Sequence, residues 1–324
     1  MAKILFILAI SLGSLFAGYL VRRAGLRGER ANRTWPETLS RRMKIWAIFI
    51  LNPLPIIDSF WRLPLSTRGI FLLPLLGVLS LLVGGTSAVV LSRLFRIPPK
   101  RAASVFTSGM FTNILTFGGL ISFVFFGYRG YAFVQLFNMF VSMTYYIIGF
   151  PLSREISIGG KPSLRALSPK ALRERPYMFV PIITMAAGLV LNLTGVQRPL
   201  VFDWASNALI PIIAGMLGAS IGLTLRLSAV GNYRLEIPLI AAIKFIIVPA
   251  VIIPLGMAFG LPAVADGLAF KVLVVVSVMP VAFNALVPPA MYGFDLDLAN
   301  SAWIVTTLSL AAILPVLYLV LQPR

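Results

Sequence analysis

Two asparagines each precede residues that disrupt helices, inside long apolar stretches. Asn113 is followed by Gly118-Gly119, and Asn284 is followed by Pro288-Pro289. Proline removes a backbone donor and clashes with the preceding turn, and each glycine lowers helix propensity by about 1 kcal/mol. An interrupted helix leaves N–H groups without partners, and their partial positive charge can hold an anion without a formal cation. These residues are therefore candidate ligands for an anion such as a carboxylate.

Either stretch alone has a structural alternative. Proline and glycine are common in membrane helices, and an asparagine there can simply hydrogen-bond to a neighbouring helix. Two corresponding interrupted stretches, however, indicate a binding site near the middle of a membrane. The matched pair favours the binding site.

Two further polar features lie in apolar surroundings. Gln135, Asn138 and Ser142 recur at helical spacing, so they share one helix face that should point into the protein, to contact a solute or to join helices. Lys244 is an intramembrane charge, which is costly. It either extends to the membrane boundary or provides a counter-charge for an anion or a coupling site.

Several kinds of chemistry are excluded or disfavoured by residue types. The sequence has no cysteine and no histidine, which excludes disulfides, thiolate catalysis and imidazole relays. No Asp or Glu lies deep in an apolar run, so no buried carboxylate relay is visible. Asp295 and Asp297 could hold a divalent metal in a membrane enzyme, but a lone pair of this kind is typical of a solvated loop. We expect no metal, no cofactor and no enzymatic activity.

The composition indicates that a membrane surrounds these residues. Of 324 residues, 59% are hydrophobic and 12% are charged, whereas soluble domains carry about 25% charged residues. Each helical span needs about 20 apolar residues, and backbone in lipid must be hydrogen-bonded within its own segment. The apolar runs cover residues 4–21, 43–60, 70–92, 102–127, 131–151, 177–195, 205–225, 236–260, 267–292 and 298–321.

The basic residues predict an orientation for these ten runs. Four alternate connections hold 20 of the 28 Lys and Arg residues, and the other side of the membrane holds seven. Positive loops face the cytoplasm, so both termini are expected outside a cell (inner) membrane. Because the net charge of +18 is distributed between apolar runs, it does not indicate a nucleic-acid partner.

The longest hydrophilic stretch divides the chain into two halves of five helices. It gives a first repeat at 1–152, a cytoplasmic linker at 153–176 and a second repeat at 177–324. Homologous halves with an odd number of helices insert in opposite orientations, as in many secondary transporters. Weak internal similarity between residues 111–115 and 282–286 supports an inverted repeat.

Seven segments resemble the auxin efflux carrier family of transporters, in its bacterial form: Ser108–Asn113, Gly118–Leu120, Phe126–Ala132, Met279–Asn284, Tyr292-Gly293, Asp297–Ala299 and Thr306–Ser309. The resemblance implies a fold similar to that of the bile acid:sodium symporters, in which helices four and nine cross. It also implies that Asn113 and Asn284 receive a substrate carboxylate. The sequence departs from the family in having Gly118-Gly119 and Pro288-Pro289 instead of a matched proline pair.

The sequence thus predicts an all-α membrane protein of ten helices in two inverted repeats, with broken, crossing helices four and nine. The predicted function is secondary transport of a small organic anion by alternating access. Its partners would be that anion and the lipid bilayer, and a homodimer is an open alternative. The alternative functions are a sodium-coupled symporter of the bile acid type, a membrane enzyme using Asp295 and Asp297, and a sensor that binds without transport.

Overall fold

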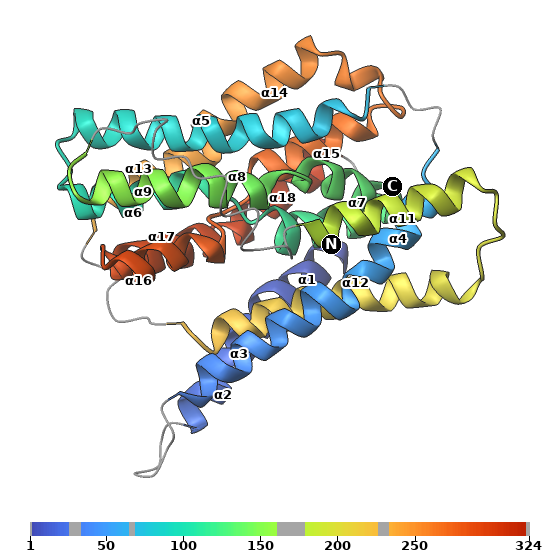
Figure 1. The fold of residues 1–324 in the computed structure, drawn as a ribbon, viewed down its shortest axis with the longest axis horizontal. Helices are drawn as coiled ribbons and strands as arrows, with labels where there is room; N and C mark the ends of the chain where they lie inside the picture. The colour runs from blue at the N-terminus through green and yellow to red at the C-terminus, as the bar shows by residue number, and fades with distance from the viewer. Residues whose placement is uncertain (1, 26–33, 65–68, 161–178, 226–232, 322–324) are drawn as a thin grey trace.

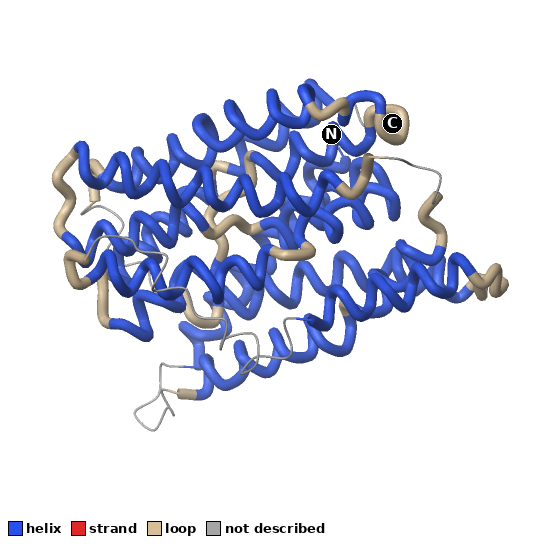
Figure 2. The backbone as a smooth tube through the Cα atoms, turned by 45° about the horizontal axis from the view of Figure 1, so that its top comes forward, coloured by secondary structure: helices blue, strands red, loops and turns tan. Residues whose placement is uncertain are grey.

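The computed structural model describes residues 2–25, 34–64, 69–160, 179–225 and 233–321, and all regular structure in these ranges is helical. Figure 1 shows the helices in two groups that lie beside each other, and Figure 2 shows the same division in a second view. We call them the small bundle and the large bundle. The predicted all-α class is confirmed.

The small bundle is built around a close contact between two helices. Its helices are α1 (Ala2–Leu8), α2 (Ser14–Gly25), α3 (Trp35–Ile45), α4 (Pro53–Trp61), α11 (Val180–Leu193) and α12 (Val201–Gly222). A Cβ atom at Gly222 would overlap the carbonyl oxygen of Leu15, and one at Gly18 would overlap that of Ala219. Only glycine lets the α2 and α12 backbones approach this closely, as small residues do at many membrane helix interfaces.

The large bundle contains most of the buried core and both interrupted stretches. Its helices are α5 (Leu72–Leu94), α6 (Pro99–Met110), α7 (Gly119–Asn138), α8 (Val141–Thr144), α9 (Phe150–Ser157), α13 (Glu236–Ala242), α14 (Val248–Ala258), α15 (Leu268–Ser277), α16 (Val287–Tyr292), α17 (Leu296–Leu308) and α18 (Leu310–Leu321). Helix α7 contacts α4, α12 and α1, so it forms much of the boundary between the bundles.

Six described helical runs are long and apolar enough to cross a membrane, and Leu296–Leu321 is a seventh if its 40° bend lies within one span. They include Trp35–Trp61, which starts before the predicted residue 43 because the helix continues through polar residues. The 44-residue run Ile114–Ser157 contains Gly127 at φ 67°, a backbone angle at which the helix cannot continue. This helix content is that of a multi-pass membrane protein.

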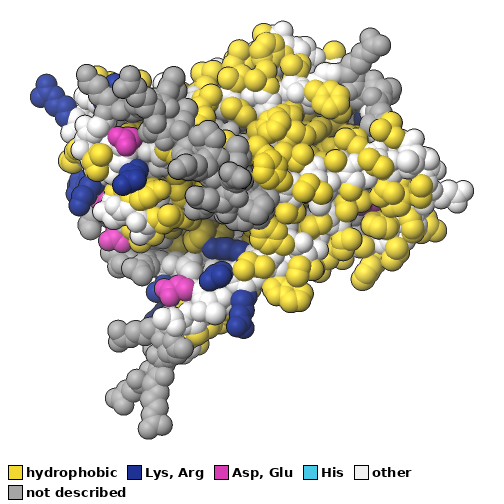
Figure 3. All heavy atoms as spheres, in the orientation of Figure 1, with side chains coloured by type: hydrophobic (Ala, Val, Ile, Leu, Met, Phe, Trp, Pro, Cys, Tyr) yellow, Lys and Arg dark blue, Asp and Glu magenta, His cyan; other side chains and the backbone are white. Residues whose placement is uncertain are grey.

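Charge and apolar surface separate along the molecule. Figure 3 shows Lys and Arg side chains gathered toward one end, where α6, α13 and α17 begin, and hydrophobic side chains over most of the opposite part. Large apolar side chains are exposed on many helices and at their ends, among them Trp204 at 75% in α12 and Phe71 at 73% just before α5. A bilayer would cover such a surface, which water would not favour.

Candidate functional site

Two helices of the large bundle are interrupted where their sequences contain the predicted asparagines. Helix α6 ends at Met110, and a π-helical segment, η3 (Ile114–Gly118), begins after Asn113. Helix α15 ends at Ser277, and the 3₁₀ segment η10 (Phe283–Leu286) follows an extended stretch. Both predicted interruptions are therefore present.

The two interruptions meet and hydrogen-bond to each other, and we call this meeting point the crossing. Thr112 and Val281 form an isolated antiparallel bridge. The Asn113 N–H donates to the Pro280 carbonyl at 2.8 Å, and the Ala282 N–H donates to the Phe111 carbonyl at 3.0 Å. Non-helical backbone at membrane depth is tolerated where the protein itself satisfies its polar groups. Each interruption thus provides a carbonyl acceptor for a backbone N–H group of the other.

The disruptive residues do not lie at the interruptions themselves. Gly118-Gly119 continues from η3 into α7, and Pro288-Pro289 occupies the first turn of α16. The prediction that these pairs break the helices is wrong by about one turn. Proline is well accommodated in a first turn, where its missing N–H would lack an intrahelical partner anyway. All four residues are buried close to the crossing.

The two asparagines differ in accessibility. Asn113 is 6% exposed, whereas Asn284, within η10, has an exposed side chain. Both lie within three residues of the bonded stretches 111–113 and 280–282. The crossing thus brings the asparagine-bearing segments together, with one amide in the interior and the other reaching an accessible surface.

Thr112 organises the crossing through three contacts. Its N–H donates to the Tyr145 hydroxyl at 2.9 Å, and that hydroxyl donates to the Thr112 carbonyl at 3.0 Å. The Tyr145 ring also stacks on Phe111, with 4.0 Å between ring centroids. On the other interruption, the Val281 N–H donates to Thr306 Oγ1 at 3.2 Å. Buried side chains thus replace the helical partners that these backbone groups have lost.

Lys244 provides the third contact to Thr112, and it lies in a different helical segment from Tyr145. It lies in the π-helical segment η8 (Ile243–Ile247), is 1% exposed, and its Nζ donates to Thr112 Oγ1 at 2.7 Å. No carboxylate in the described ranges forms an ion pair with it. Its side chain thus lies in the interior of the large bundle, on Thr112, and does not reach an exposed surface. A buried ammonium without a counter-charge is costly, and a nearby anion would offset that cost.

The polar face of the fifth run is buried as predicted, since Gln135 is 1% and Asn138 is 8% exposed. Gln135 Nε2 forms no hydrogen bond within normal geometry in the described part of the chain, and its side chain lies close to the Tyr131 hydroxyl. One turn earlier, the Tyr131 hydroxyl donates to Asn52 Oδ1 of the small bundle at 2.6 Å. This hydrogen bond connects the two bundles directly.

A small cavity lies at this connection. Asn52, Tyr131 and Thr116 line it together with apolar residues of α7, α12 and η3, and its volume is about 10 Å³. That is room for about one water molecule. The boundary between the bundles is thus closed beside the crossing, and no organic anion fits there without movement of one bundle.

Two ion-pair clusters lie at opposite ends of the molecule (Figure 1). At one end Asp58, which is fully buried, pairs with Arg62 and Arg198 and accepts from Ser206 at 2.6 Å. Asp203 pairs with both arginines, and these bonds keep the pKa of Arg198 above its ordinary value despite the opposing effect of burial. Asp58 is near a helix end, as predicted, but it is not solvated.

At the other end, Arg101 pairs with Glu236 at 3.1 Å and with Asp295 at 3.5 Å. Asp295 also accepts from the Leu298 N–H, as the N-cap of α17, and from the Tyr233 hydroxyl at 2.8 Å. Burial, together with this carboxylate, raises the pKa of Tyr233 above its ordinary value. Asp295 is thus occupied in joining α6, α13 and α17, and the described residues contain no cluster of three or more potential metal-ligating side chains.

Sequence reasoning missed Thr112, Tyr145, Thr306 and the Asn52–Tyr131 pair. Hydroxyl groups are common in membrane helices, so their types alone carry little signal. The structure adds one common feature. Asn52 and Asn113 each flank a π-helical segment as its cap residue, and Tyr145 and Lys244 each lie within one. Such segments occur frequently at functional sites.

No protein-family model matches the chain, and no curated protein matches it.

Proposed function

We propose that this protein is a secondary carrier that moves a small organic anion, in the simplest case a carboxylate, across the membrane. The observation that carries the proposal is the crossing of two interrupted helices beside Lys244, a buried amine that pairs with no carboxylate in the described ranges. The Lys244 amine and the side-chain amides of Asn113 and Asn284 are hydrogen-bond donors for an anion, and a bound anion would favour the protonated form of the amine. A carrier needs such a site inside the membrane, reachable from either side in turn.

We assign the chain ten spans, in two inverted halves of five, and a place near the auxin efflux carrier family. Three features support this proposal. The interruptions fall in the fourth span of the first half and the fourth span of the second. Gly127 divides the longest helical run where the fourth and fifth spans should meet. The shorter apolar helices Val180–Leu193 and Leu268–Ser277 lie where the sixth and ninth spans are expected.

Alternating access would come from movement between the two bundles. The crossing belongs entirely to the large bundle, whereas the small bundle contributes Asn52 and the apolar residues of α12 to the closed boundary. Separation of the bundles would break the hydrogen bond between Tyr131 and Asn52 and enlarge the cavity enough for an anion. Asn284, being exposed, would be the first polar group that an anion meets, and Asn113 would hold it.

The orientation is part of the proposal. The end that carries Arg101, Glu236 and Asp295 also carries most of the basic connections, so it would face the cytoplasm. The end that carries Asp58 and Arg198 would face outward. Both chain termini would then lie outside the cell membrane.

A thermal-shift screen of the purified protein tests the site. Acetate, malonate and malate would each be titrated against wild type and Asn113→Ala, in sodium and in potassium buffers. At least one carboxylate should raise the Tm of wild type, because a ligand that binds only the folded state stabilises it. That increase should be absent in Asn113→Ala.

The matched control is Asn192→Ala, because the Asn192 amide donates to the carbonyls of Phe60 and Leu63, away from the crossing. It should lower the starting Tm and leave the ligand-induced increase intact. A carboxylate that stabilises wild type and Asn113→Ala equally would contradict the proposed site. Stabilisation that requires sodium would favour a sodium-coupled symporter.

A further inference from the structure

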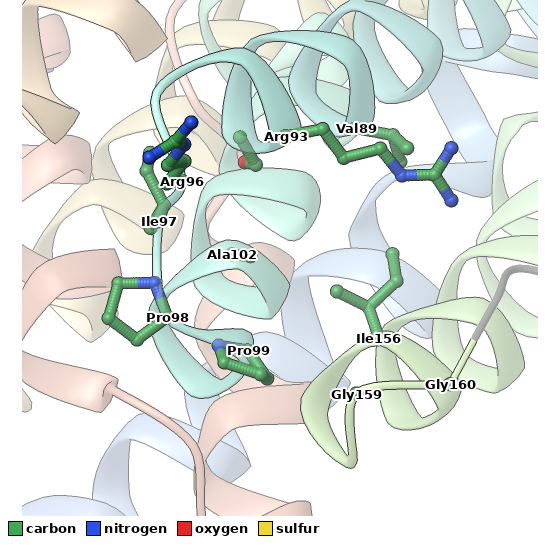
Figure 4. Close-up of a pocket in the computed structure, with 11 residues that line it drawn as sticks. Val89, Arg93, Arg96, Ile97, Pro98, Pro99, Ala102, Ile156, Gly159 and Gly160 are labelled. Atoms are coloured by element: carbon green, nitrogen blue, oxygen red, sulfur yellow. The ribbon is translucent and has the colours of Figure 1, made fainter.

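A second hollow lies away from the crossing, at the basic end of the large bundle. It has a volume of about 300 Å³ and is enclosed by the end of α5, the α5–α6 connection and the residues that follow α9. Figure 4 shows Arg93 along one side of the hollow, Ile156 beneath it, and Pro98 and Pro99 on the other side. It is separate from every residue of the candidate site.

The polar part of this hollow suits an anion. Arg93 and Arg96 line it, both are exposed, and neither forms an ion pair with an acidic residue in the described ranges. Ser92 also lines it and is 5% exposed, and its Oγ has no hydrogen-bond partner there. None of the described lining residues is acidic. Two free guanidinium groups and a buried free hydroxyl thus surround one space.

The start of α6 borders the hollow but offers it no free backbone donor. Of its lining residues there, Pro98 and Pro99 have no N–H, and the Ala102 N–H donates to the Pro98 carbonyl at 2.8 Å. The hydrogen-bond donors around this space are therefore the two arginines and Ser92.

The rest of the hollow is apolar and borders the lipid-facing surface. Val89, Ile97 and Ile156 line it. Just outside it, Val90 is 56% exposed and Leu94 is 69% exposed, as expected for residues in contact with acyl chains. A basic pocket between helix ends at the membrane boundary is the usual setting for a lipid headgroup. A free inorganic anion would make no use of these apolar walls.

Arg96 has a backbone conformation that does not favour arginine. Its φ is 52°, in the left-handed region that glycine adopts without strain. A glycine or asparagine would suit this turn better, so the arginine is present at a conformational cost. Replacement by glycine therefore removes the guanidinium without harming the fold.

We propose that this hollow binds the phosphate headgroup of an anionic phospholipid, with Arg93, Arg96 and Ser92 around the phosphate and the apolar walls around the glycerol and upper acyl chains. The lipid would join the ends of α5, α6 and α9. The lipid site is independent of the transported solute, so it can be tested separately from the proposed carrier function.

Native mass spectrometry of the purified protein tests this site. Phosphatidylglycerol, phosphatidylcholine and inorganic phosphate would each be titrated against wild type, Arg93→Gln, Arg96→Gly and Arg41→Gln. The last variant is the control, because it removes one exposed positive charge from α3, away from the hollow. Circular dichroism would confirm that each variant is folded.

Wild type should retain phosphatidylglycerol in preference to phosphatidylcholine. Each of the two hollow variants should weaken phosphatidylglycerol binding about fivefold, which corresponds to about 1 kcal/mol per basic residue at an anionic surface. Arg41→Gln should bind as wild type does. Equal retention by all four proteins, equal binding of the two lipids, or binding of inorganic phosphate without binding of phosphatidylglycerol would each overturn the proposal.

Discussion

Replacing Thr112 by valine should destabilise the protein because it leaves Lys244 with no partner. The Nζ of Lys244 is buried and donates to Thr112 Oγ1 at 2.7 Å, and the described part of the chain offers it no carboxylate. A hydrogen bond to a charged group contributes about 1.5–3 kcal/mol, and an unsatisfied buried donor adds its desolvation cost. We therefore expect Thr112→Val to lower the free energy of unfolding by about 2 kcal/mol, or the Tm by roughly 4 °C.

Lys244→Met provides the complementary test. It removes the ammonium and keeps most of the apolar volume, so it should be close to neutral. The double variant Thr112→Val with Lys244→Met should be more stable than Thr112→Val alone, because no donor is then left unpaired. The coupling between the two positions should be about 2 kcal/mol, which is within the range observed for contacting residues.

The measurement is thermal unfolding in detergent, followed by tryptophan fluorescence. Thr144→Val is the matched control: Thr144 is 6% exposed, and its hydroxyl donates only within its own helix, to the Phe140 carbonyl at 2.9 Å. It should cost less than Thr112→Val. If the two variants lose equal stability, or if Lys244→Met does not rescue Thr112→Val, the contact between Thr112 and Lys244 does not exist as described.

Three other substitutions test separate parts of the structure by the same unfolding measurement. Gly222→Leu should destabilise the protein by about 3 kcal/mol or more, because its side chain would overlap the Leu15 carbonyl and separate α2 from α12. Asp58→Asn should cost about 3 kcal/mol, since it leaves Arg198 without its buried carboxylate; unchanged stability would mean that water already pairs the arginine. Tyr131→Phe should lower the free energy of unfolding by only about 1 kcal/mol, the contribution of one neutral hydrogen bond. A larger decrease would contradict the assignment of a single hydrogen bond to Asn52.

The sequence located the interruptions but not the groups that stabilise them. Apolar runs and the position of an asparagine are local features, so Asn113 and Asn284 could be found from the chain alone. The hydrogen bonds from Asn113 to Pro280 and from Ala282 to Phe111 join residues far apart in sequence, and no local pattern predicts them. The glycine and proline pairs do not mark the interruptions themselves, because a residue that disrupts a helix interior can also lie at the start of the next helix.

The environment of Lys244 could not be predicted from the sequence either. Its position in an apolar run left two outcomes open, since a lysine can either reach the membrane boundary or find a partner in the interior. The choice depends on whether a hydroxyl lies within reach, and Thr112 belongs to a distant part of the chain. The packing of Tyr145 on Phe111, which fixes Thr112, likewise depends on tertiary structure.

Solute counterflow tests the central claim, that the crossing is the binding site of a carrier. Proteoliposomes preloaded with the carboxylate that gives the largest thermal shift would be diluted into the same labelled compound. Wild type should accumulate label transiently, and Asn113→Ala should not, whereas Asn192→Ala should behave as wild type does. Binding of the carboxylate without any transient accumulation by wild type would contradict the claim, because a protein that binds and does not exchange is not a carrier.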